Sequence, residues 1–177
     1  MLAELAGRPL VRHSAEQLLE SGVESVMVVV RPGQAALRAA LEHLPVQLIE
    51  SVNADNGMSA SLAAGLRALP VTTEAVVVAL GDQPTILPEV IDRLIATWRA
   101  TGKPIVVPMY GGVRGHPVLF ARAVFAELLA VRGDQGGRDV IALDPGRVAE
   151  VTVDAPAPAD VDVQEDLRKL GPPHADE

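Results

Sequence analysis

The sequence predicts an α/β fold with a mainly parallel sheet. Residues 25–30 and 75–80 form nearly unbroken apolar runs, which are typical of strands buried on both faces of a sheet. Segments with helical spacing of apolar residues separate these runs and the shorter predicted strands, and this alternation indicates crossover units. The chain of 177 residues is long enough for one domain with a sizeable core, which we expect over residues 1–170, followed by a disordered tail over 171–177.

The first half of the chain gives three helices and three strands in alternation. Pro9 suits the first position of a helix over 9–21, and Gly22 provides its stop. Strand 25–30 follows. Leucines at helical spacing then predict helices over 34–44 and 59–69, with a short strand at 46–50 between them and the apolar strand 75–80 after them.

The second half continues the pattern with shorter elements. A helix is expected over 88–100, a strand over 104–108, a Gly-rich turn over 110–115 and a strand over 117–120. The remaining predicted elements are helices at 121–131 and 137–143, a strand at 148–153, and a terminal helix near 164–170. The Gly-rich run at 133–137 is interpreted as a flexible loop.

Composition excludes several classes of protein. Lys and Arg total 15 against 23 Asp and Glu, and this net charge of -8 argues against a nucleic-acid partner, although not against a single nucleotide. The chain has no cysteine, so it has no disulfide, thiolate nucleophile or Cys-based metal site. No apolar run approaches the ~20 residues of a membrane span, and no signal-peptide pattern is present, so we expect a cytoplasmic protein without a membrane partner.

The segment 80–84 carries the most informative candidate site. It directly follows the apolar strand 75–80, and ligands in open α/β sheets bind at the carboxyl ends of strands. Gly81 allows close approach of the backbone, Asp82 offers a hard oxygen ligand, and Pro84 fixes the turn. Asp82 is a candidate ligand for Mg²⁺, which prefers one or two carboxylates together with phosphate oxygens. The alternative is an aspartate that only caps a turn.

Two further loops have the composition of ligand-binding segments. In the stretch that begins with Gly57 and Met58, Ser59 or Ser61 is expected to cap a helix whose N–H groups face an anion; ordinary capping without a ligand is the alternative. In the loop 111–117, Arg114 and His116 combine a cation with an imidazole among glycines, and either presents them to an anionic substrate or forms a simple turn.

An acidic segment near the C-terminus supplies a possible second metal ligand. Asp160 and Asp162 alternate, so in an extended segment both face the same side, and one of them could lie opposite Asp82. Glu165 and Asp166 suit the positive end of the terminal helix. Helix capping and solvation are the alternative explanation for these acidic residues.

Taken together, these motifs resemble the pattern of MobA-like NTP transferases, and most nearly that of the molybdenum cofactor cytidylyltransferase branch. The resemblance spans residues 1–170 and rests on four motifs in the family's order. They are Gly57-Met58-Ser59-Ala60-Ser61-Leu62, Gly81-Asp82-Gln83-Pro84, Arg114-Gly115-His116-Pro117, and Asp160-Val161-Asp162 with Glu165-Asp166-Leu167.

The resemblance implies a Rossmann-like three-layer sandwich of the nucleotide-diphospho-sugar transferase type, and a Mg²⁺-dependent reaction. A nucleotidyl group, CMP from CTP in this branch, passes to molybdopterin carrying molybdenum, and pyrophosphate is released. A molybdenum-dependent hydroxylase would receive the product. Asp82 and Asp162, with Asp160 as the alternate, match the metal ligands and catalytic residues.

The remaining matched residues divide between the two substrates. The stretch of Gly57, Met58, Ser59 and Ser61, together with Gly81 and Asp82, matches the nucleotide side. The acceptor side is matched by Gln83, Pro84, Arg114, Gly115, His116 and Pro117.

One departure from the family concerns the N-terminus. The family begins with a strand and a Gly-rich loop of the form Leu-Ala-Ala-Gly-x-Ser-x-Arg-Met-Gly, whereas this sequence opens just before the predicted helix 9–21. We therefore expect that the first strand is missing and that the natural protein starts further upstream. Two other readings remain: an NTP transferase for another phosphorylated acceptor, and a non-catalytic protein that binds a nucleotide or a partner.

Overall fold

The computed structural model describes residues 1–52, 57–133, 136–161 and 166–167. Its helices are α1 (Leu10–Leu19), α2 (Ala35–Ala40), α3 (Met58–Ala68), α4 (Pro88–Thr101), α5 (Phe125–Ala130) and α6 (Arg138–Leu143), with 3₁₀ turns η2 (Arg122–Val124) and η4 (Pro145–Arg147). Its strands are β1 (Glu4–Leu5), β2 (Arg8–Pro9), β3 (Val26–Val30), β4 (Val46–Glu50), β5 (Ala75–Val78), β6 (Ile105–Tyr110), β7 (Val113–Arg114), β8 (Val118–Ala121) and β9 (Val148–Val153).

The larger sheet has the order β5-β8-β6-β7, with β9 paired to β6. Strand β8 runs antiparallel to both β5 and β6, so β5 and β6 point the same way, and β9 is parallel to β6. This arrangement confirms the α/β class, in which β8 and the short β7 are the strands of this sheet that run against the others.

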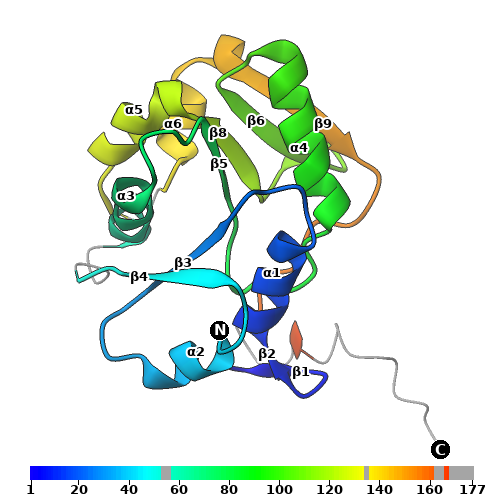
Figure 1. Cartoon of the computed structure of the whole chain (residues 1–177). Coiled ribbons are helices and arrows are strands. Elements are labelled where there is room, and N and C mark those ends of the chain that lie inside the picture. Colours follow the sequence, from blue (N-terminus) through cyan, green and yellow to red (C-terminus); the bar gives the residue numbers. More distant parts are fainter. Residues whose placement is uncertain (53–56, 134–135, 162–165, 168–177) are drawn as a thin grey trace, which may run out of the picture.

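Alternating side chains of β6 and β8 build two separate cores on the two faces of this sheet. Ile105 and Val107 pack with α3, α5 and α6, whereas Val106 packs with α4 and β9. In β8, Phe120 faces the first core and Leu119 the second. The period of two in a pleated strand thus produces a three-layer sandwich, with α1 and α4 on one side and α3 and α5 on the other (Figure 1).

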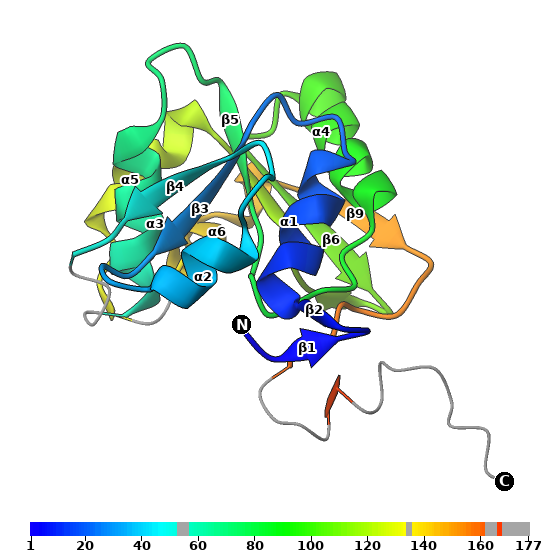
Figure 2. The same cartoon turned by 60° about the horizontal axis from the view of Figure 1, so that its bottom comes forward.

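Strands β3 and β4 form a second, parallel sheet with a core of its own. That core contains Val30 of β3, Val11 and Ala15 of α1, and Leu37 and Leu41 in and after α2. Among the described residues, no hydrogen bond of the sheets joins β3 to β5. The two sheets are connected through helices, because α1 and α3 pack against β3 and also contact α4 and α5, which cover the larger sheet. The two sheets therefore occupy one layer and each has an unpaired inner edge (Figure 2).

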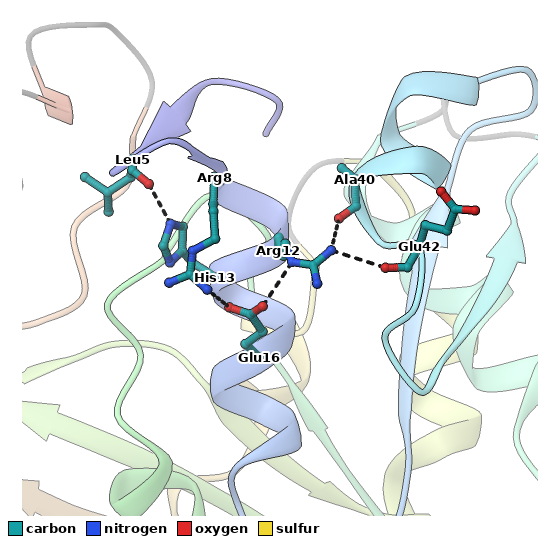
Figure 3. A network of polar contacts seen from close by, with 7 residues as sticks. All are labelled: Leu5, Arg8, Arg12, His13, Glu16, Ala40 and Glu42. Carbon is teal, nitrogen blue, oxygen red and sulfur yellow. Dashed lines mark hydrogen bonds and ion pairs between the residues drawn. The ribbon is translucent and has the colours of Figure 1, made fainter.

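A hairpin of β1 and β2 precedes the first helix, and the sequence reading did not predict it. Its turn contains Ala6 and Gly7, both with positive φ (51° and 75°), a conformation that suits a two-residue hairpin. His13 holds this hairpin on α1, because its Nε2 donates to the Leu5 carbonyl over 2.8 Å (Figure 3).

A charged network on α1 continues from this hairpin to α2 (Figure 3). The Glu16 carboxylate accepts from Arg8 over 2.9 Å and from Arg12 over 3.0 Å. Arg12 also donates to the carbonyls of Ala40 and Glu42, at 3.1 and 3.2 Å, where α2 ends. One arginine thereby satisfies carbonyls that a helix C-terminus leaves without partners.

The observed helices differ from the predicted ranges at points where the backbone chemistry explains the change. The helix predicted over 34–44 ends at Ala40, and it could not extend to Leu44 because His43 has a positive φ of 68° and Leu44 precedes Pro45. The helix predicted over 121–131 begins with the 3₁₀ turn η2. Helix α4 agrees with the prediction, since Pro88 begins it and Gly102 ends it in the left-handed conformation.

Two predictions about the chain ends concern residues outside those described. The expected tail over 171–177 lies there, as does most of the expected helix 164–170, of which only residues 166–167 are described, as helical. Among the described residues, no helix is long and apolar enough to cross a membrane.

We expect the backbone amides of β3 and β5 to exchange with solvent faster than those of β6. Strand β6 has hydrogen-bonded neighbours on both sides, whereas β3 and β5 each pair along one edge. Hydrogen–deuterium exchange followed by NMR measures this difference. Equal protection of all three strands would contradict it.

Candidate functional site

The turn after β5 places Asp82 at the carboxyl end of that strand. Gln83 N–H donates to the Leu80 carbonyl over 3.3 Å, and Gln83 and Pro84 are buried beneath the turn. The Asp82 residue is half-buried, and its Oδ1 is buried without a hydrogen-bond partner. A carboxylate oxygen in this state is costly unless a ligand satisfies it.

Helix α1 and the N-terminal segment hold Gly81 in place. Ser14 Oγ donates to the Gly81 carbonyl over 3.2 Å. A Cβ added to Gly81 would lie 2.6 Å from Met1 Cε, so the N-terminal segment passes directly over this turn. The backbone at Gly81 therefore lies close to the Met1 side chain, and its approach to a ligand stays a prediction.

The late acidic segment lies against the same turn. Gln83 Nε2 donates to Asp160 Oδ1 over 2.7 Å, and Val161 N–H donates to the Asp82 carbonyl over 3.1 Å. The structure thus brings Asp160 next to the Asp82 turn, as predicted for the two acidic segments. Asp162 and Glu165 lie outside the described residues, while Asp166 and Leu167 form a short helical piece. The metal-binding role of these aspartates remains a prediction.

His116 joins this group from the loop after β7. Tyr110 Oη donates to the His116 carbonyl over 3.0 Å, and Gly115 N–H donates to the Pro108 carbonyl over 3.1 Å. A Cβ on Gly115 would lie 2.8 Å from the Tyr110 ring, so only glycine allows this close packing. Pro117 is buried, and the His116 ring interacts with the backbone of Val78, the last residue of β5.

Burial lowers the pKa of His116, and its Nδ1 is buried without a partner. The Val78 carbonyl opposes that shift, Arg138 adds to it, and Asp160 and Asp82 oppose it more weakly. The charges of Arg138, Asp160 and Asp82 all act on the His116 ring. Burial therefore disfavours the charged form of the ring and lowers the pKa of His116.

Arg114 lies in the same 111–117 segment as His116, but its side chain pairs with a residue of β9. Its guanidinium forms an ion pair of 3.0 Å with Glu150 of β9, and both side chains are partly exposed. The structure therefore does not bring Arg114 together with Asp82, Asp160 and His116. Its proposed contact with substrate remains untested.

The segment at the start of α3 begins differently from the sequence prediction. Gly57, with φ 92°, is the N-cap and makes no side-chain cap. Ser59, expected to be a cap, is buried inside the first turn, and Ser61 is half-buried on α3. Met58 begins the helix and is about half exposed at 48%.

The loop expected to be flexible over 133–137 packs against this segment where it is described. A Cβ on Gly136 would lie 3.0 Å from Met58 Sδ, and one on Gly137 would lie 2.6 Å from Phe120 Cζ. At Gly136 and Gly137, glycine is thus required for close packing, and the flexibility of the loop stays a prediction. The same contacts position Arg138, which the sequence reading missed. The signal was an arginine directly after two glycines at the start of a helix.

The oxygen atoms at this turn are of the chemical kind that binds a divalent cation. Asp82 Oδ1 and Gln83 Oε1 are both buried without partners, and Asp160 supplies a second carboxylate. Mg²⁺ and Mn²⁺ prefer such oxygen ligands and commonly use only one or two protein carboxylates. Within the described ranges, no group of three or more His, Cys, Asp or Glu residues is arranged as a complete metal cage.

Comparison with known proteins supports the same fold along nearly the whole chain. Nicotine blue oxidoreductase of Paenarthrobacter nicotinovorans is 28% identical over 93% of this chain and 83% of its own length. The structure of Rv0371c from Mycobacterium tuberculosis H37Rv in complex with manganese has 27% identity and a TM-score of 0.82 over 96% of this chain and 89% of that one. A nucleotidyl transferase from Methanothermobacter, at 20% identity over 96% of this chain and 82% of its own, has a TM-score of 0.79 and shows the fold alone.

The model of the MobA-like NTP transferase domain matches residues 1–152. This match covers the sheet, the Asp82 turn and the His116 loop. The chain therefore belongs to the MobA-like NTP transferase domain family, a family of nucleotidyltransferases.

Proposed function

We propose that this protein transfers a nucleotidyl group from a nucleoside triphosphate to a phosphorylated acceptor and releases pyrophosphate. The observation that carries the proposal is the attachment of the Asp160 segment to the Asp82 turn, which places two acidic residues from distant segments at the end of β5. Ligands in open α/β sheets bind at this position.

The reaction forms a bond between an acceptor phosphate oxygen and the α-phosphorus of the nucleotide, and breaks the bond from that phosphorus to the pyrophosphate oxygen. Such a transfer requires positioning and neutralisation of charge, and no covalent protein nucleophile. Asp82, with Asp160 or Asp162, would hold the divalent cation, which supplies positive charge against the phosphates. Manganese in the related Rv0371c structure supports a divalent metal, and we propose Mg²⁺ as the ion in the cell.

The residues around His116 favour a role on the acceptor side. A neutral imidazole with an unpaired nitrogen can form a hydrogen bond with the acceptor substrate. Such a ring adds no charge beside the metal ligands. Arg138 supplies positive charge on the same side. Gly57, Met58, Ser59 and Ser61 at the start of α3 would lie beside the nucleotide.

The proposed donor is CTP, and the proposed acceptor is the molybdenum cofactor. Four motifs in the order of the cytidylyltransferase branch support this choice. A molybdenum-dependent hydroxylase would receive the product, and the reaction would take place in the cytoplasm. Because a fold does not by itself determine a reaction, and one relative has the name of an oxidoreductase, substrate tests are decisive.

The first experiment measures pyrophosphate released from CTP or GTP with the molybdenum cofactor and Mg²⁺. Release that needs both CTP and the cofactor supports the proposal. Release with a sugar phosphate in place of the cofactor would indicate the alternative acceptor. Absence of nucleotide binding at millimolar Mg²⁺ would indicate a non-catalytic protein.

We expect Asp82→Asn to lower turnover on the order of 10²-fold, the size typical of losing one preorganised electrostatic contact to a transition state. The melting temperature should not fall, because the buried Asp82 Oδ1 has no protein partner to lose. Glu24→Gln is the matched control, since Glu24 is exposed and precedes β3. Full activity of the Asp82 variant would rule out its assignment as a metal ligand.

His116 should titrate with a midpoint below 6.5, since burial disfavours the charged ring. Arg138→Ala should raise that midpoint, because Arg138 lowers the pKa of His116. NMR of the ring protons against pH measures both values. A midpoint that does not respond to the Arg138 variant would show that the two side chains are electrostatically independent.

A further inference from the structure

Gln83 is a polar residue whose side chain is buried in the turn after β5. It is 5% exposed, although a primary amide is strongly polar and costly to bury without partners. Its Nε2 has a partner, Asp160 Oδ1 at 2.7 Å, whereas its Oε1 is buried and has none. What distinguishes Gln83 at this position is its hydrogen bond to Asp160, because an apolar side chain would fill the same space at a lower desolvation cost.

The contact reaches a segment that no regular secondary structure holds in position. After β9 ends at Val153, residues 154–161 adopt neither helix nor strand. The chain is attached at the end of this stretch by the Val161 N–H bond to Asp82 and by burial of the Val161 side chain, which is 7% exposed. The backbone bond fixes where the segment lies, but it does not orient the Asp160 carboxylate.

The amide of Gln83 supplies that orientation. A carboxylate that accepts a hydrogen bond on Oδ1 has its rotation restricted, and Oδ2 then has a defined direction. Gln83 Oε1 and Asp82 Oδ1, from adjacent residues, are both buried and both unpaired, so three oxygen-bearing groups are held at this turn.

We infer that Gln83 is a positioning residue that holds Asp160, and that Asp160 is the late carboxylate that acts with Asp82 on the divalent cation. The inference rests on the proposed function and assigns a role to Gln83 that differs from direct contact with the acceptor. The conservative replacement Gln83→Met keeps the length and fills the space, but it removes the amide donor.

The test is the affinity of the nucleotide-free protein for Mn²⁺, measured by EPR of the free ion. We expect Gln83→Met to raise the dissociation constant by about tenfold, the lower end of the 10–100-fold range typical of partners that orient metal ligands. Asp160→Asn keeps an oxygen that can accept from Gln83 and removes the charge. It should weaken Mn²⁺ binding by at least as much, with an unchanged melting temperature.

Glu127→Gln is the matched control for stability. It weakens the paired bonds of 2.7 and 2.9 Å between Glu127 and Arg147, so it should lower the melting temperature without changing Mn²⁺ affinity. If Gln83 has a structural role alone, Gln83→Met will behave like this control, and the inference fails. If Asp162→Asn weakens binding and Asp160→Asn does not, the inference also fails.

Asp82→Asn separates failure of this inference from failure of the proposed function. If Asp82→Asn loses Mn²⁺ binding and Gln83→Met binds normally, the metal site is supported and only the role of Gln83 is overturned. Unchanged binding in Asp82→Asn overturns the metal site itself. If Gln83→Met does not fold, Mn²⁺ should still broaden the side-chain amide signal of Gln83 in the wild-type protein, and no broadening would overturn the inference.

Discussion

The hydrogen bond from Gln83 to Asp160 joins residues 77 positions apart, and the arrangement of the site depends on it. The segment after β9 has no helix or strand to direct it until Val161 and Asp160 reach the Asp82 turn. These two hydrogen bonds, from Gln83 to Asp160 and from Val161 to Asp82, therefore place a second carboxylate beside the turn that carries Asp82. Because acidic residues repel one another, such a group is stable only where hydrogen bonds or a cation offset the repulsion.

The opposite side of the site is built on the packing of β6. Tyr110, the last residue of that strand, packs in the core below α4 and donates from its hydroxyl to the His116 carbonyl. Gly115 lies against the Tyr110 ring at a distance that excludes any larger residue. The core thus fixes the loop that carries His116, whose pKa is lowered by burial, and this suits chemistry that is controlled by positioning and charge.

Several elements were predictable because one local pattern determines them. Val26–Val30 and Ala75–Val78 read as buried strands, and Pro88 with Gly102 marks both ends of α4. The hairpin at Ala6 and Gly7 was missed because its strands have two residues each and show no periodicity. The close packing at Gly136 and Gly137 could not be predicted, because a glycine-rich sequence does not show which distant side chains its backbone approaches.

The sequence alone determined the α/β class, the order of the elements, the family and the four motifs, since apolar periodicity and short motifs are local properties of the chain. It also indicated Asp82 as a residue at a strand end. Only the tertiary structure decided that Asp160 contacts Gln83, that Arg114 turns to Glu150, and that Arg138 lies near His116. Those relations arise from contacts between segments far apart in the chain, and no local pattern encodes which side chains meet when the layers pack.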